Sequence, residues 1–232
     1  MSKIAVIPAR AGSKRIPNKN FLEIEGLPVV GHAVELARST DIFDEIIVSL
    51  DSHSQKEELS YLGASLHLRP ESLGQDDVKT IDVVRDVIRE KEIPQNTDLC
   101  CIYPASILLK KERIIEGYET YLTNQNRFIF AAQPSPINPL RTFAYDSNTK
   151  NIIFTDSSFV KNNAHNSLEF YSDAGQFYWA KTATWMNQSD ILNSDSVPLF
   201  LNRWEIIDID YPEDLGVALL IRARALTEGK SE

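Results

Sequence analysis

Residues 3–20 read KIAVIPARAGSKRIPNKN, a short apolar run followed by a loop that gathers positive charge. The run contains β-branched residues, a pattern typical of a strand buried in a parallel sheet. The loop holds four Lys or Arg residues, and no acidic residue precedes Glu23. A loop after a strand can offer backbone N–H groups to a phosphate, and cations strengthen such a site. The stretch therefore predicts the first strand of an α/β fold and a site for an anionic ligand, with a solvated basic turn as the alternative.

Strand-like and helix-like segments alternate after this opening. Such an order implies right-handed crossovers and a mainly parallel sheet, whose ligands bind beyond the carboxyl ends of the strands. The opening loop, the end of VSLD and the segment YPAS all fall at such ends, which predicts one crevice. The expected strands are 45–51, 65–70, 98–104 and 128–134, and the expected helices are 27–39, 54–63, 79–92 and 110–124.

The pattern changes from about residue 135 to residue 187, where short strand-like segments are joined by Asn- and Ser-rich turns. We expect a β-rich insertion over 135–187 that covers the ligand or pairs with a second subunit. A final helix is expected over residues 212–227.

Composition limits the class of partner. The formal net charge is -9, which argues against an extended basic face for nucleic acid. No secretory signal or membrane span is visible, because the apolar run of residues 4–7 is too short. The adjacent Cys100 and Cys101 argue against a disulfide framework or a zinc pair and favour a buried strand with the two side chains on opposite faces. We expect a reduced, cytoplasmic protein.

The segment WEIIDID, residues 204–210, predicts a strand that returns to the sheet. On a strand, Asp208 and Asp210 would lie on one face, roughly 6–7 Å apart, and could share one Mg²⁺. The alternative for Asp210 is a helix cap, in a capping box with Glu213. Asp51, at the end of a predicted strand, is a third metal candidate or a turn residue. The four histidines show no metal-binding spacing.

Polar and aromatic residues are mixed in DAGQFYW, residues 173–179. Strand alternation places Asp173 and the other odd-numbered residues on one side and Gln176 on the other, where it could read hydroxyl or amide groups of a ligand. Core packing is the ordinary role of the aromatic residues. Arg69 follows a predicted strand and Thr80 begins a predicted helix, so both could reach a ligand or be ordinary surface and capping residues.

Five segments together resemble the nonulosonic acid cytidylyltransferases, the CMP-sialic acid synthetase family, over nearly the whole chain. They are IPARAGSKRIPNKN, EIIVSLD, LRPESLGQDD, DAGQFYW and IIDIDYPEDL. The opening loop is the most specific, because the family pattern is close to P-A-R-x-G-S-K-R-[IL]-P-x-K-N. The wording YSDAGQFYW resembles the branch that uses pseudaminic acid. The resemblance implies a Rossmann-like nucleotidyltransferase fold in one domain, 1–232, and a reaction of CTP with a 2-keto sugar acid that gives the CMP-sugar and pyrophosphate.

The resemblance also implies roles for individual residues. Those expected to bind CTP are Arg10, Ser13, Lys14, Lys19, Asn20, Arg69 and Thr80. Those expected to act in catalysis are Lys19, Arg10, Asp208 and Asp210. The two aspartates would hold Mg²⁺, and Lys19 would face the α-phosphate, where negative charge develops. Gln176 and Asp173 would contact the sugar, and the β-rich insertion would form a homodimer.

Two segments depart from the family pattern. Ile107 stands where the family usually carries a second proline, and residues 161–175 lack the arginine expected before DAGQ. The sequence therefore leaves open which residue binds the sugar carboxylate, and Lys161 and Arg141 are the candidates. N-acetylneuraminate, legionaminate and 3-deoxy-manno-octulosonate remain alternative acceptors, and a non-catalytic nucleotide-binding module remains an alternative function. A dinucleotide-dependent oxidoreductase has little support, because Gly-x-Gly-x-x-Gly is absent.

Overall fold

The computed structural model describes the chain except for residues 13–14, 136, 140–141, 155–168 and 229–232. The strands of its main sheet are β1 (Lys3–Pro8), β4 (Glu45–Leu50), β5 (Ser65–Leu68), β6 (Asp98–Ile102), β7 (Ile129–Pro134), β10 (Tyr171–Lys181) and β11 (Val197–Phe200). The helices are α1 (Val29–Ser39), α2 (His53–Glu58), α3 (Thr80–Glu90), α4 (Lys111–Thr123), α6 (Thr182–Asn187) and α7 (Pro212–Glu228). Two short antiparallel pairs are β2 (Glu23–Ile24) with β3 (Leu27–Pro28) and β8 (Phe143–Asp146) with β9 (Asn151–Phe154).

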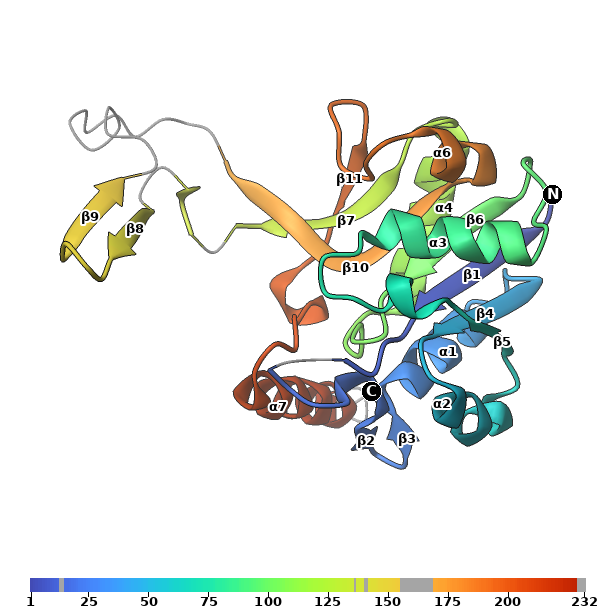
Figure 1. Cartoon of the computed structure of the whole chain (residues 1–232), viewed down its shortest axis with the longest axis horizontal. Helices are drawn as coiled ribbons and strands as arrows, with labels where there is room; N and C mark the ends of the chain where they lie inside the picture. The colour runs from blue at the N-terminus through green and yellow to red at the C-terminus, as the bar shows by residue number, and fades with distance from the viewer. Residues whose placement is uncertain (13–14, 136, 140–141, 155–168, 229–232) are drawn as a thin grey trace.

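The main sheet has the strand order β11-β7-β10-β6-β1-β4-β5 (Figure 1). Four of its neighbouring pairs are parallel, and β10 runs antiparallel to both β6 and β7. Between β1 and β7 the chain passes through a helix after each strand of the main sheet, as crossover connections require. The predicted α/β fold with a mainly parallel sheet and flanking helices is confirmed.

Both faces of the sheet are covered. One face packs against α1 and α4, and the other packs against α3 and α6, which lie in front in Figure 1. Cys100 and Cys101 of β6 are unpaired and lie on opposite faces, as predicted. Burial raises the pKa of both thiols, so they serve as small apolar core residues.

The predicted strand over residues 204–210 is wrong. The chain forms a 3₁₀ turn at Arg203–Glu205 and then an irregular segment up to α7. The strand that joins the sheet here is β11, which pairs with β7 and ends the sheet. Pro198 obscures the strand pattern of β11, but an edge strand tolerates a proline because one side needs no ladder hydrogen bonds.

Within residues 135–187 the structure separates two parts. Strands β8 and β9 form a hairpin that projects from the body, and residues 143–154 are called the arm from here on (Figure 1). By contrast, β10 is a strand of the main sheet and α6 packs on the sheet face. Of the described residues in this range, the arm is the part that stands apart from the sheet.

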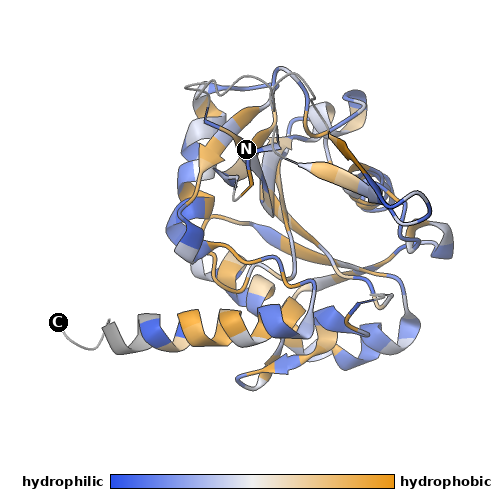
Figure 2. Ribbon diagram, turned by 90° about the vertical axis from the view of Figure 1, so that its left-hand side faces the viewer, coloured by the Kyte–Doolittle hydropathy of each residue, from blue (hydrophilic) through white to orange (hydrophobic). Residues whose placement is uncertain are grey.

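Helix α7 extends beyond the body toward the C-terminus (Figure 2). Its apolar side chains are divided between a buried contact at Ala218 and an exposed side that includes Leu220. No helix within the described ranges combines the length and the hydropathy needed to span a bilayer.

Candidate active site

A cavity of about 510 Å³ opens at the carboxyl ends of β1, β5 and β6. The predicted site residues that line it are Arg10, Lys19, Asn20, Arg69, Thr80, Gln176, Asp208 and Asp210. Asp173 instead lines a neighbouring cavity of about 350 Å³, which shares Thr80 and Tyr103 with the first. Ser13 and Lys14 lie outside the described residues. The crevice expected at the carboxyl edge of the sheet is therefore present.

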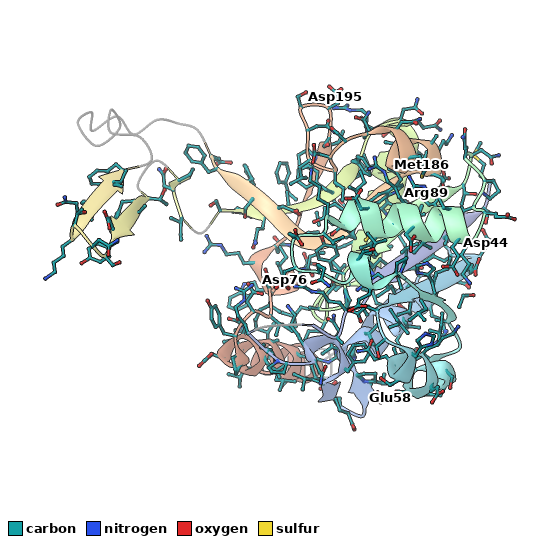
Figure 3. All side chains as sticks on the ribbon, viewed as in Figure 1. Asp44, Glu58, Asp76, Arg89, Met186 and Asp195 are labelled. Carbon is teal, nitrogen blue, oxygen red and sulfur yellow. The ribbon has the colours of Figure 1, made fainter. Side chains whose placement is uncertain are left out.

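The opening loop is held by the strand next to β1. Asp51, which follows β4, accepts hydrogen bonds from the backbone N–H of Ala11 at 2.9 Å (Oδ1) and 3.2 Å (Oδ2). The buried Asn20 donates from Nδ2 to the carbonyl of Arg10 at 3.0 Å. Arg10 Nη1 in turn lies 2.7 Å from Oδ1 of Asp76, which precedes α3 and is labelled in Figure 3. Of its two predicted roles, Asp51 thus takes the turn role, because its carboxylate shapes the loop.

A small apolar cluster fixes the two aspartates relative to this loop. Ile209 is 1% exposed and packs in one cluster with Ile16 of the loop and Ala218 of α7. Since Ile209 is turned into the cluster, Asp208 and Asp210 on either side of it face the cavity, which both line. The predicted pairing of the aspartates on one wall holds, although the segment is not a strand.

The cations of the loop meet Asp210. Arg15 Nη1 lies 2.8 Å from Asp210 Oδ2, and Lys19 Nζ lies 3.7 Å from Asp210 Oδ1. Lys19 Nζ also donates to the carbonyl of Ile209 at 2.5 Å. The ammonium group is therefore positioned by the same segment that carries the aspartates.

A different carboxylate from the one that the sequence indicated binds the backbone at the start of helix α7. Asp214 Oδ2 accepts hydrogen bonds from the backbone N–H groups of Asp210 at 2.9 Å and Tyr211 at 2.7 Å. A capping box between Asp210 and Glu213 is therefore wrong. Asp214 binds the two N–H groups that precede Pro212, and the carboxylate of Asp210 caps no N–H group among the described residues and lines the cavity instead.

The surroundings of Asp208 suit a cation. Asp208 makes no hydrogen bond or ion pair with any residue that the structure describes. Desolvation by the surrounding protein and then the negative charge of Asp210 raise the pKa of Asp208, and Lys19 and Arg15 offset this only in part. Asp208 and Asp210 both line the cavity, and Asp208 has no ion pair among the described residues, so the two carboxylates fit a hard divalent ion such as Mg²⁺.

Arg69 also lines the cavity and is 4% exposed. Its Nη1 donates to the carbonyl of Ser49 at 3.1 Å, and its Nη2 lies 3.7 Å from Asp51 Oδ2. Burial lowers the pKa of Arg69, and Asp51 acts in the opposite direction. The buried Nε–H has no hydrogen-bond partner among the described residues. A fixed guanidinium with an unused donor can bind a phosphate, a sugar hydroxyl or a base carbonyl.

Gln176 presents a buried acceptor where it lines the cavity. Its Nε2 donates to the carbonyl of Ala174 at 2.8 Å, whereas its buried Oε1 has no partner among the described residues. A buried acceptor without a hydrogen bond costs free energy of folding unless a ligand donates a hydrogen bond to it.

The alternation predicted for residues 173–179 fails at its start. The register of β10 against β7 shifts between Asp173 and Tyr178, and Gly175 adopts a φ of 58°. This irregularity lets Asp173 Oδ2 accept a hydrogen bond from the Tyr178 hydroxyl at 2.6 Å, although strict alternation would place the two on opposite faces. Asp173 is thereby turned toward the neighbouring cavity, and its contact with a sugar stays a prediction.

Among the cavity residues that were not predicted individually are Arg15, Asp76 and Tyr103, which carry ionisable groups. Arg15 belongs to the cationic loop, so its signal was present in the charge pattern. Tyr103 shares a 2.6 Å hydrogen bond with Thr80, and burial raises its pKa to about 12. Tyr103 and Asp76 stand in segments that the sequence singled out, YPAS and LRPESLGQDD, but which side chain of each segment faces the cavity depends on the packing of distant elements.

A comparison with protein families identifies the kind of protein. A family model described as cytidylyltransferase matches residues 4–216. The chain belongs to the cytidylyltransferase family. It is therefore a nucleotidyltransferase, and the cavity at the carboxyl edge of its sheet is the candidate active site of a cytidylyltransferase.

Two relatives align with this cytidylyltransferase along almost their whole length. The chain is 32% identical to the pseudaminic acid cytidylyltransferase of Campylobacter jejuni, over 95% of this chain and 96% of that protein. It is 29% identical to the CMP-N,N'-diacetyllegionaminic acid synthase of Legionella pneumophila, over 92% of this chain and 93% of the relative.

A solved structure confirms the fold. CMP:2-keto-3-deoxy-manno-octonic acid synthetase complexed with CTP superposes with a TM-score of 0.66 and covers 99% of this chain and 100% of its own. The sequence identity is 15%, so this likeness bears on the fold alone. The cytidylyltransferase has the Rossmann-like nucleotidyltransferase fold that the sequence predicts.

Proposed function

We propose that this protein transfers a cytidylyl group from CTP to a nonulosonic acid, with pseudaminic acid as the acceptor. The observation that carries the proposal is a single cavity with loop cations on one wall, the buried Arg69 on another and a pair of aspartates beside the cations. The choice of acceptor is supported by the 32% identity to a pseudaminic acid cytidylyltransferase over nearly the full length of both chains.

The triphosphate of CTP would bind along the opening loop. Arg10, Arg15 and Lys19 line the cavity and carry the positive charge that a triphosphate needs. Phosphate oxygens would replace the carboxylates of Asp76 and Asp210 as partners of these cations. Ser13 and Lys14 are proposed to extend the same site. The nucleoside would lie toward Arg69 and Thr80 on the other side.

The reaction forms a bond between the anomeric oxygen of the sugar and the α-phosphorus, while the bond from that phosphorus to the bridging oxygen breaks and pyrophosphate leaves. The proton of the attacking hydroxyl is released as the new bond forms. Lys19 would neutralise the negative charge that develops on the α-phosphate, which is the main task of a protein in such transfers. Asp208 and Asp210 would hold Mg²⁺, which when bound neutralises phosphate charge and lowers the pKa of the attacking hydroxyl.

The acceptor sugar would lie beside Gln176, whose unpartnered Oε1 can accept a hydrogen bond from a hydroxyl or amide group. Asp173 lines the adjoining cavity and would contact a more distant substituent of the sugar. Lys161 and Arg141, the candidates for the sugar carboxylate, lie outside the described residues.

We also propose a homodimer that forms through the arm. Its exposed apolar side chains are Phe143, Tyr145, Ile152 and Ile153. A two-stranded hairpin is marginally stable in water, so these side chains favour a covering partner. The free, buried cysteines accord with a reducing cytoplasmic compartment.

The test is pyrophosphate release from CTP and Mg²⁺, run in parallel with pseudaminic, legionaminic, N-acetylneuraminic and 3-deoxy-manno-octulosonic acids. Release that depends on pseudaminic acid is the expected result. Release with another acid alone would keep the reaction and refute the choice of acceptor. Binding of CTP without release with any acid would favour the non-catalytic module.

A further inference from the structure

A second group of ionisable side chains lies behind the wall that carries Arg69. It consists of His67 on β5 and of Asp86 and Glu90, which are one turn apart on α3. His67 Nε2 lies 3.2 Å from Asp86 Oδ2 and 2.8 Å from Glu90 Oε2. One potential ligand atom from each residue lies within 4.8 Å of the others. This group could not be predicted from the sequence, because His67 has no other histidine or cysteine at a metal-binding spacing.

Ordinary hydrogen bonds do not account for the contacts. His67 is 1% exposed, and its Nε2 has no hydrogen-bond partner among the described residues, although Glu90 Oε2 is only 2.8 Å away. Asp86 Oδ2 is also buried without a hydrogen-bond partner within that part of the chain, although His67 Nε2 lies 3.2 Å away. Two adjacent unsatisfied atoms in a buried place are costly, and a shared ligand would relieve both.

The ring of His67 is already oriented toward the two carboxylates. Its Nδ1 lies 3.0 Å from the hydroxyl of Ser49 on β4, which fixes the ring plane and leaves Nε2 directed at Asp86 and Glu90. A hydrogen bond at the far nitrogen is the usual support of a metal-binding histidine.

The distances suit a small divalent ion. With zinc bonds of about 2.0–2.2 Å to nitrogen and oxygen, neighbouring ligand atoms of a tetrahedral ion lie roughly 3.3–3.6 Å apart. The separation of 3.2 Å lies just below this range, and that of 2.8 Å would widen by roughly half an ångström on binding, which the exposed Glu90 side chain permits. The Glu90 side chain is 53% exposed, which leaves a route for the ion and room for a water ligand.

The charges also suit a cation. A neutral imidazole can donate its Nε2 lone pair, and the two carboxylates balance the charge of a divalent ion.

We propose that His67, Asp86 and Glu90 bind one Zn²⁺ ion that ties β5 to α3. The site is separate from the Asp208 and Asp210 pair and does not depend on the proposed reaction. Its effect on the cavity is structural, because β5 leads into Arg69 and α3 begins with Thr80. The Ser49 hydroxyl joins the two sites, since it lies 3.0 Å from His67 Nδ1 and 3.4 Å from Arg69 Nη1.

The test uses the full chain without an affinity tag, stripped of metal and free of CTP, and titrated with Zn²⁺ in a calorimeter. One ion per chain is expected. Glu90→Gln and Asp86→Asn should each weaken binding at least about 100-fold, because losing even an outer partner of a metal ligand typically costs about 10–100-fold. Glu92→Gln is the matched control, since it removes the same charge from an exposed position two residues away.

A second measurement distinguishes this site from the active site. Co²⁺ in place of Zn²⁺ should give a visible ligand-field spectrum in the parent chain and in the Asp208→Asn/Asp210→Asn double variant, and not in Glu90→Gln. Unchanged Zn²⁺ affinity in Glu90→Gln, or a spectrum lost only in the double variant, would overturn the proposal. Since both readouts are taken without CTP, an inactive enzyme would leave them unaffected.

Discussion

The cavity and the arm differ in what fixes their exposed side chains. The cavity carries charged groups on backbone that is held by buried residues, as Ile209 and Ile16 hold the aspartates beside Lys19. The arm carries apolar groups on two strands that pair only with each other in the described sheets. The charged wall is thus set by the core of the protein, whereas the apolar arm has no core of its own.

This difference separates two kinds of role. Polar groups on a rigid frame can recognise and stabilise charge, because their positions do not change when the ligand arrives. Exposed apolar groups on a hairpin gain free energy only when another surface covers them. Changes at the cavity should therefore alter turnover without altering assembly, and changes at the arm should do the reverse.

The largest effect is expected from Lys19→Ala. If Lys19 meets charge that develops in the transition state, kcat should fall by about 100- to 1,000-fold, while the Kd of CTP should rise less than about tenfold. Steady-state kinetics and CTP titration measure the two quantities, with the exposed Lys56→Ala as control. Equal losses in kcat and affinity would mean that Lys19 contacts only the ground state.

A smaller effect is expected from Asp208→Asn. Removing one of two carboxylates should raise the Mg²⁺ concentration for half-maximal activity by about 10–100-fold, in the range found when the support of a metal ligand is lost. A Mg²⁺ titration of pyrophosphate release measures this, and Asp195→Asn, at an exposed position, is the control. An unchanged midpoint would remove Asp208 from the metal site.

The frame beneath the cavity is tested by Gly117→Ala. A Cβ at Gly117 of α4 would lie 2.6 Å from Phe177 Cε2 and 3.0 Å from Trp179 Cδ1, so the core must move. Such overpacking typically costs about 1–3 kcal/mol of the free energy of unfolding.

A second helical glycine provides the matched control. A Cβ at Gly216 of α7 meets no atom within 4 Å, so Gly216→Ala should stabilise the chain by about 0.5–1 kcal/mol through helix propensity. Urea unfolding measures both variants. If Gly117→Ala changed the free energy of unfolding as little as Gly216→Ala does, α4 would be able to shift away from the sheet at little cost.

The smallest effect on the stability of the single chain is expected from changes in the arm. Tyr145 and Ile152 are paired across β8 and β9 and are exposed, so Tyr145→Ser/Ile152→Ser should separate a dimer into monomers. The free energy of unfolding of the monomer should change by less than about 0.5 kcal/mol per site, as is usual for exposed positions. Sedimentation at several concentrations measures the assembly, with exposed Tyr61→Ser as control. A parent chain that is monomeric throughout would end the proposal of an arm-mediated dimer.

Local patterns determined much of this protein. The alternation of apolar strands with amphipathic helices, the Pro- and Gly-punctuated cationic loop and the two aspartates near the C-terminus all rest on neighbours within a few residues. Backbone sterics and side-chain periodicity act over that range. The sequence could therefore predict the parallel sheet and a site for an anionic ligand at its carboxyl edge.

Only the tertiary structure decided the rest. The segment before α7 lacks a strand partner, the irregularity at Gly175 turns Asp173 toward Tyr178, and Asp214 rather than Glu213 accepts a hydrogen bond from the Asp210 N–H. His67 meets Asp86 and Glu90 because β5 and α3 pack together. Each of these outcomes depends on which distant backbone supplies a hydrogen bond or excludes water, and no short stretch of sequence contains that information.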